Sequence, residues 1–183
     1  MSVVVRRVRA DEGERVRDLR LDAVRDVAAP IAFLSTFEEE AGRDDDFWAA
    51  RAAGSAEGDA VAQFVAETAD EWVGTVTVIR RSPGETDHHG RPVTAARGDV
   101  VGVYVRPEHR GSGTIGALLD AAADWARSRG DRALSLDVHE DNARAQAAYR
   151  RAGFHDTGGR FTASIGPEIE MSRPLIAEGG ASS

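Results

Sequence analysis

The longest continuous pattern of apolar and polar positions runs from Asp99 to Arg129. A β-branched apolar run over 99–105 predicts a strand. A basic turn, Arg106–Arg110, and a glycine-rich segment, Gly111–Gly116, come next. An amphipathic helix is then predicted, because apolar residues recur at steps of three and four: Ile115, Leu118, Leu119, Ala122, Trp125 and Ala126. A strand, a glycine loop and a helix in this order place free backbone N–H groups at a helix N-terminus, where phosphate groups bind.

The other elements follow from the same periodicities. Upstream, the pattern predicts a strand over 3–8 and a helix that begins at a capping box of Asp11 and Glu14 and ends at Pro30. A second helix is predicted from Ser35 or Thr36 to Gly54. A hairpin of strands 60–67 and 72–79 follows, and then an irregular polar loop over 80–98. Downstream, it predicts a strand over 132–138, a helix from Asn142 to Gly153, and two closing strands over 154–164 and 168–173. The central strand–helix–strand–helix order favours a mixed sheet with parallel strands in its middle.

Composition narrows the class of protein. The 183 residues, 42% hydrophobic and 30% charged, fit one globular domain, which we expect over 1–176 with a disordered tail over 177–183. A net charge of −8 argues against nucleic acid as a partner. Without cysteine, the chain has no disulfide, thiolate nucleophile or cysteine-ligated zinc. No apolar run reaches membrane-spanning length and the N-terminus has no signal-peptide layout, so we expect a cytoplasmic protein.

The glycine loop by itself leaves several interpretations open. An ordinary tight turn between strand and helix is one. A dinucleotide-binding loop is another, because Gly111, Gly113 and Gly116 match G-x-G-x-x-G and Asp137 lies about 20 residues onward, where such folds place a ribose-binding acid. The basic turn Arg106–Arg110 weighs against that interpretation, since the strand of a dinucleotide fold runs almost directly into the first glycine.

Two motifs together explain more of the sequence. The first is Tyr104-Val105-Arg106-Pro107, followed by Arg110-Gly111-Ser112-Gly113-Thr114-Ile115. It resembles the acetyl-CoA-binding motif of the GNAT superfamily of N-acetyltransferases, and the second family motif is complete in Asn142, Ala145, Tyr149, Gly153 and Phe154. Where the family has a small residue, this chain has Ile115, with Gly116 one place later. We expect Ile115 to point into the core between helix and sheet, with a locally altered loop.

The resemblance implies a fold, a cosubstrate and a set of contacts. The fold would be an α/β structure with a mixed, mostly antiparallel sheet, a central parallel pair of splayed strands and flanking helices. Acetyl-CoA would be the acyl donor, its pyrophosphate held by the loop and its pantetheine arm by the exposed backbone of the preceding strand. The implied cofactor-binding residues are Val103, Tyr104, Val105, Arg110, Gly111, Ser112, Gly113, Thr114, Ile115, Gly116, Asn142 and Tyr149.

Two residues receive catalytic roles from the same resemblance. Tyr149 would protonate the leaving thiolate of coenzyme A, although a core aromatic is the alternative. Asp99 stands where many members carry a glutamate that acts as general base, and Glu67 and Glu71 are rivals for that role. Asn142 could contact the cofactor or serve only as a helix N-cap.

The expected activity is transfer of an acetyl or other short acyl group from acetyl-CoA to a primary amine of a small molecule or protein, by direct attack in a ternary complex. The alternatives are a catalytically silent acetyl-CoA sensor and a dinucleotide-dependent oxidoreductase. We expect no metal site, because the adjacent His88 and His89 seldom converge on one ion without further ligands. Acetyl-CoA and an amine are the expected partners, with a second copy of the chain as a further candidate and neither nucleic acid nor membrane.

Overall fold

The computed structural model describes residues 2–175. Its helices are α1 (Gly13–Arg25), α2 (Phe37–Ala41), α3 (Asp45–Ala56), α4 (Thr114–Ser128) and α5 (Ala143–Arg151), with short 3₁₀ turns η1 (Ala29–Ile31) and η2 (Pro107–His109). The strands are β1 (Val4–Arg7), β2 (Val61–Glu67), β3 (Trp72–Arg81), β4 (Arg97–Val105), β5 (Ala133–His139), β6 (His155–Ala163) and β7 (Gly166–Pro174). The tail predicted over 177–183 lies outside the described residues.

All seven strands form one sheet in the order β1-β2-β3-β4-β5-β7-β6. Among the described residues, β4 and β5 form the only parallel pair, and they pair only at Gly98–Leu134 and Asp99–Ser135. Both strands continue beyond these pairs without bonding to each other, so they diverge toward their C-terminal ends. The predicted mixed, mostly antiparallel sheet with a central splayed parallel pair is confirmed. A doubly wound parallel sheet, which a dinucleotide domain requires, is absent from residues 2–175.

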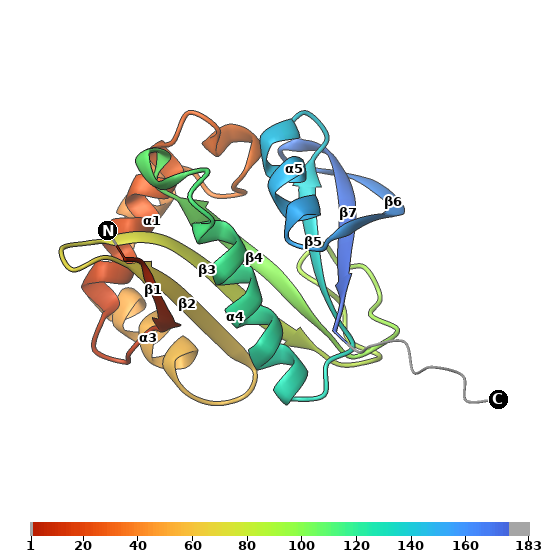
Figure 1. The fold of residues 1–183 in the computed structure, drawn as a ribbon, viewed down its shortest axis with the longest axis horizontal. Coiled ribbons are helices and arrows are strands. Elements are labelled where there is room, and N and C mark those ends of the chain that lie inside the picture. Colours follow the sequence, from red (N-terminus) through yellow and green to blue (C-terminus); the bar gives the residue numbers. More distant parts are fainter. Residues whose placement is uncertain (1, 176–183) are drawn as a thin grey trace.

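Helices cover both faces of the sheet (Figure 1). The apolar stripe of α4 packs on β2, β3 and β4, with Leu118 and Leu119 fully buried in a core that also holds Tyr149 of α5. On the opposite face, α1 and α3 bury Val16 and Trp48 against Tyr104 of β4. Successive side chains of β4 therefore point into the two cores in turn: Tyr104 faces α1 and α3, whereas Val105 faces α4.

Two predicted helix boundaries are wrong. The capping box at Asp11 and Glu14 does not form, because α1 begins at Gly13 and the carboxylate of Glu12 instead accepts from the Arg9 N–H at 2.8 Å. The helix predicted from Thr36 to Gly54 is two helices. Thr36 caps α2 in a capping box with Glu39, and Asp44 caps α3 by accepting from the Phe47 N–H at 2.8 Å.

The predicted loop is shorter than expected and is held by one carboxylate. β3 extends to Arg81 and β4 begins at Arg97, so the connection spans 82–96. Within it, Asp87 Oδ1 accepts from the N–H groups of His89 and Arg91 at 2.9 Å each, and Asp87 Oδ2 accepts from Arg91 Nε at 2.8 Å. These bonds fix the positions of His88 and His89 beside the point where β4 and β5 begin to separate.

At Gly98, in the parallel pair of β4 and β5, neighbouring side chains lie too close to leave room for a Cβ atom. A Cβ atom there would lie 2.7 Å from Val78 Cγ1 and 2.9 Å from Leu134 Cδ2. We expect Gly98→Ala to lower the free energy of unfolding by about 1–3 kcal/mol through overpacking, as measured by urea denaturation. Gly54→Ala, within α3 and with no atom within 4 Å of the new Cβ, is the matched control and should raise stability by up to about 1 kcal/mol. Equal stability of the two variants would contradict this account of Gly98.

Candidate functional site

A cavity of about 750 Å³ opens where β4 and β5 diverge. Its walls are the backbone of β4, the end of β5, the glycine loop, α5, the segment 26–34 after α1, and the tip of the 82–96 loop. Phe33 and Leu34, which come before α2, and Ile79 of β3 also line the cavity. The diverging strands thus create one continuous site from residues that are far apart in the chain.

The glycine loop forms the wide end of the cavity and presents bare backbone. Gly111 and Gly113 have φ of 76° and 88°, values that L side chains rarely adopt, and Gly113 is the N-cap of α4. None of the N–H groups from Gly111 to Gly116 donates a hydrogen bond to another residue within 2–175. Nothing beyond the neighbouring residues lies within 4 Å of a Cβ built at Gly111, Gly113 or Gly116, so no other part of the described chain crowds the loop at these glycines. The loop and the α4 dipole together suit a phosphate group.

Ile115 lies in the first turn of α4 and packs against the core that α4 shares with the sheet, as expected. The helix begins at Thr114 despite this larger side chain, so the expected local change of the loop leaves its N-terminal geometry intact. Ser112 fixes the loop further, because its Oγ donates to the His109 carbonyl at 2.6 Å and lies 2.9 Å from Thr114 Oγ1.

The edge of β4 that faces β5 is unpaired beyond Asp99. A β-bulge is centred on Gly102, whose φ is 61°, and the register to β3 shifts there. The sequence analysis missed this bulge, although a glycine inside a strand pattern is the usual signal. Val103, Tyr104 and Val105 follow the bulge and line the cavity, so an extended ligand could pair with this exposed backbone edge.

Tyr149 and Asn142 both line the cavity from α5. Tyr149 is 8% exposed, packs at 6.0 Å between ring centroids on Phe154, and its hydroxyl has no hydrogen-bond partner within 2–175. Burial raises the pKa of Tyr149 to about 12. Asn142 is the N-cap of α5, because its Oδ1 accepts from the Ala145 N–H at 3.2 Å. The capping interpretation of Asn142 is confirmed, and its place in the cavity wall leaves room for a contact as well.

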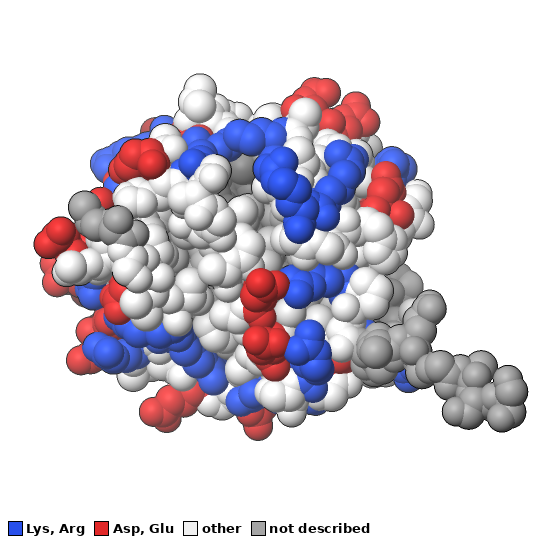
Figure 2. Space-filling view, in the orientation of Figure 1, with Lys and Arg blue, Asp and Glu red and all other residues white. Residues whose placement is uncertain are grey.

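Arginine supplies the positive charge around the wide end. Arg110 donates from Nε to the Val105 carbonyl at 2.9 Å and forms an ion pair with Asp26, so it braces the loop against the end of α1. Arg144 and Arg151 of α5 also line the cavity. Figure 2 shows positive side chains gathered over the upper part of this face, at the level of α5. Apart from histidine, all of the basic side chains in the sequence are arginine, since it contains no lysine.

The acids predicted as general bases lie elsewhere. Asp99 is buried and is not part of the cavity wall. One of its oxygens lies 2.8 Å from Arg97 Nε and the other 3.3 Å from Arg81 Nε. Burial raises the pKa of Asp99, against the opposing effect of these arginines. Glu67 pairs with Arg6 at 2.7 Å, and Glu71 is exposed beside Arg106, so neither reaches the cavity.

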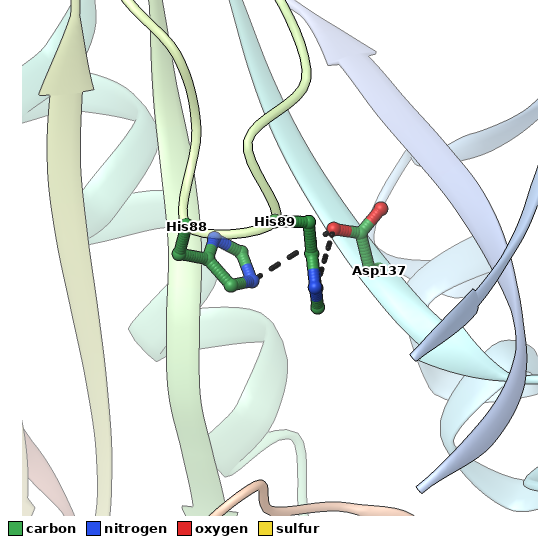
Figure 3. Close-up of side chains that lie close together, drawn as sticks. All are labelled: His88, His89 and Asp137. Carbon is green, nitrogen blue, oxygen red and sulfur yellow. Dashed lines mark ion pairs between the residues drawn. The ribbon is translucent and has the colours of Figure 1, made fainter. Parts of the chain in front are cut away.

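A cluster of titratable side chains lies where β4 and β5 begin to separate, and we call it the histidine–carboxylate cluster: His88, His89, Asp137 and Glu168. Figure 3 shows the first three of these side chains. The Nε2 atom of His89 lies 3.6 Å from Asp137 Oδ2 and 3.5 Å from Glu168 Oε2. Burial lowers the pKa of both histidines and raises the pKa of both acids. The sequence analysis did not group these residues, because they come from a loop and two strands.

The same cluster is a poor cation cage. His88, His89 and Asp137 offer ligand atoms within 4.8 Å of one another. Arg91 Nη2, however, donates to Asp137 Oδ2 at 2.7 Å, so a guanidinium already occupies the oxygen that would face an ion. A metal would have to displace this positive charge.

Comparison with known proteins agrees with the geometry. Over 97 residues the chain is 38% identical to aminoglycoside N(6')-acetyltransferase type 1 of Stenotrophomonas maltophilia, covering 52% of this chain and 61% of that protein. Over 52 residues it is 50% identical to streptothricin acetyltransferase of Streptomyces lavendulae, covering 28% of each. The matched part therefore spans less than two thirds of either relative. PaiA N-acetyltransferase of Thermoplasma acidophilum, solved with coenzyme A, shares the fold at a TM-score of 0.73 and 15% identity, covering 95% of this chain and 99% of that one.

Within residues 2–175, no helix has the length and apolar character needed to cross a membrane. The model of the acetyltransferase (GNAT) family matches residues 21–154, which is more than half of the chain and includes the splayed strands, the glycine loop and all of α5. The chain belongs to the GNAT acetyltransferase family.

Proposed function

We propose that the protein transfers an acetyl group from acetyl-CoA to a primary amine by direct attack in a ternary complex. The observation that carries this proposal is the wide end of the cavity, where the N–H groups of Gly111–Gly116 have no hydrogen-bond partner within 2–175 and lie beside the unpaired edge of β4. Bound acetyl-CoA would supply the activated acyl group as a thioester. Cysteine is absent, so a cysteine acyl-enzyme has no nucleophile available.

Different residues of the chain would bind different parts of acetyl-CoA. The loop N–H groups would bind the pyrophosphate, and Arg144 and Arg151 would attract the phosphates to the cavity mouth. The backbone of Val103–Val105 would pair with the pantetheine arm and polarise the thioester carbonyl. Arg110 would act mainly by bracing the loop, because Asp26 already neutralises its charge.

Tyr149 would give its hydroxyl proton to the departing thiolate. With a pKa of about 12 the phenol stays protonated at neutral pH, and its hydroxyl has no competing partner within the described part of the chain. Asp99 was the general base predicted from the sequence, and its two arginine partners hold it outside the cavity wall.

The acceptor is proposed to be a small cationic amine. Two relatives are named for aminoglycosides and for streptothricin, and the net charge of −8 favours cations. An amine on a protein is the second candidate. A cytoplasmic location and a homodimer are retained as proposals from the sequence.

Two experiments test the donor site and separate an enzyme from a silent acetyl-CoA sensor. Calorimetry with acetyl-CoA and with NADH tests the donor site, and release of free thiol is then followed with an aminoglycoside, streptothricin, a polyamine and a peptide N-terminus as acceptors. Binding of acetyl-CoA without turnover of any amine would favour the sensor. Binding of NADH without acetyl-CoA would refute the proposed function.

Gly113→Ala should weaken acetyl-CoA binding. A side chain at a φ of 88° costs about 1–2 kcal/mol, and a loop that relaxes to avoid this cost loses its aligned N–H groups, so we expect affinity to fall by about 5- to 30-fold in calorimetry. Gly58→Ala introduces the same strain, at a φ of 81°, in a turn before β2 that does not line the cavity, and is the control. Equal affinities of the two variants would count against the loop as the phosphate site.

Tyr149→Phe should lower kcat at least about tenfold, because the thiolate loses its proton donor. The affinity for acetyl-CoA in calorimetry should stay within about twofold of the wild type, since the phenyl ring keeps its packing on Phe154. Wild-type kcat in this variant would remove Tyr149 from the acid role.

Tyr149 should also titrate late. A tyrosine in the unfolded chain is half-ionised near pH 10, so at that pH the folded protein should absorb less as tyrosinate than the same protein in urea. The folded state holds this proton more tightly; its contribution to stability is therefore complete below pH 10 and is lost as the pH rises toward 12. Circular dichroism checks that the protein is folded, and Tyr149→Phe should remove the latest ionisation. If Tyr149→Phe instead removed an ionisation near pH 10, the raised pKa of Tyr149 would be contradicted.

A further inference from the structure

We propose that the histidine–carboxylate cluster is the amine site of the cavity, in which Asp137 and Glu168 bind the acceptor's amino group and His89 accepts its proton during attack. This inference rests on the proposed acetyl transfer and assigns the acceptor side of that reaction.

The cluster lies at the correct end of the cavity. The pairing of β4 with β5 ends at Asp99–Ser135, and Asp137 is the second residue beyond that point on β5. A donor whose phosphates sit on the glycine loop, at the wide end, extends its acyl group toward the place where the strands meet. The reacting carbon and the cluster therefore share the closed end of the same cavity.

The cluster also has unused hydrogen-bonding capacity. Glu168 is 5% exposed, and its Oε2 accepts no hydrogen bond from any residue within 2–175. The same holds for Asp137 Oδ1. Buried carboxylate oxygens without donors are costly, and an ammonium group carries three donors. His89 Nε2 lies 3.5 Å from Glu168 Oε2, too far for a good hydrogen bond, so an ammonium donor there would give this oxygen the partner it lacks. Asp137 Oδ2 already accepts from Arg91, which leaves Asp137 Oδ1 as the second oxygen for the amine.

The charges around His89 suit a proton acceptor. Burial keeps the imidazole neutral near pH 7, and after it accepts a proton it faces two carboxylates. Arg91 pairs with both Asp87 and Asp137, which offsets part of their negative charge. The other charged or titratable groups acting on the cluster are His88 on His89, His139 and Arg91 on Glu168, Glu170 on Asp137, and Asp99 and Arg81 on His88.

The protons of the reaction balance as follows. The bound ammonium group first releases one proton to solvent, which leaves the neutral amine that attacks. As the amine nitrogen bonds to the acyl carbon, it gives a second proton to His89 Nε2, which requires the neutral tautomer with hydrogen on Nδ1. As the carbon–sulfur bond breaks, the thiolate takes the proton of the Tyr149 hydroxyl. The imidazolium then returns its proton to the phenolate through solvent, so the enzyme regains its starting state with amide and free thiol as products.

Asp99 fits a positioning role in this arrangement. It contacts Arg97 at 2.8 Å, and Arg97 Nη2 donates to Asp87 Oδ2 at 3.3 Å. Asp87 in turn accepts from the backbone N–H of His89. Asp99 thus supports, through one arginine, the loop that carries the proton acceptor.

The test compares His89→Gln with wild type, using whichever amine of the acceptor panel is turned over. We expect kcat to fall about 100-fold, the usual effect of losing a general base. The acidic limb of the pH profile of kcat/KM should disappear, while the affinity for acetyl-CoA in calorimetry stays unchanged. His155→Gln, the same exchange on exposed β6, is the matched control and should keep both the rate and the limb.

Two further variants separate chemistry from structure. His89→Ala should regain at least about tenfold in rate when imidazole is added, whereas Tyr149→Phe should gain nothing. Asp99→Asn should lower kcat but keep the acidic limb. Retention of that limb in His89→Gln, absence of imidazole rescue in a folded His89→Ala, or loss of the limb in Asp99→Asn would each overturn the inference while leaving acetyl transfer intact. Binding of acetyl-CoA without turnover of any amine by the wild type would overturn the proposed function and this inference together.

Discussion

The structure depends on the short parallel pairing of β4 and β5. These strands share hydrogen bonds at only two residue pairs and then separate, which leaves a row of backbone donors and acceptors without partners in the middle of the sheet. In a buried sheet such an edge is normally costly. Here the gap is tolerated because it opens into a cavity, and both cores, under α4 and under α1 and α3, hold the diverging strands from opposite faces.

Charge is distributed unevenly along this cavity. Its wide end combines the α4 N-terminus with arginines, and its closed end combines two buried acids with two histidines. Ion pairs keep these groups in place: Arg110 ties the glycine loop to Asp26, and Arg91 ties the 82–96 loop to Asp137 of β5. The geometry of the site therefore depends on arginine–carboxylate pairs that reach between distant segments.

Local signals in the sequence predict most of the fold. The strand, glycine loop and helix around Gly113, and the capped helix at Asn142, have short-range causes that a single sequence reveals. The predicted start of α1 was wrong because Glu12 stands at the N-cap position and its carboxylate bonds to Arg6 and to the Arg9 N–H instead of capping the helix. The histidine–carboxylate cluster could not be predicted, since Glu168 meets His89 only after β7 inserts between β5 and β6. The sequence shows which chemical groups a residue carries, but it does not show which residues lie next to it across the sheet.

The arginine-only surface has a consequence for a protein that handles an acyl thioester. A lysine amine near the donor site would itself be a nucleophile and could become acetylated. A guanidinium stays protonated and does not attack a thioester at neutral pH. Because the sequence contains no lysine, the charges that would attract the phosphates of the donor cannot be erased by the acyl group it carries. Phosphate attraction by this chain therefore depends on side chains that the acyl donor does not modify.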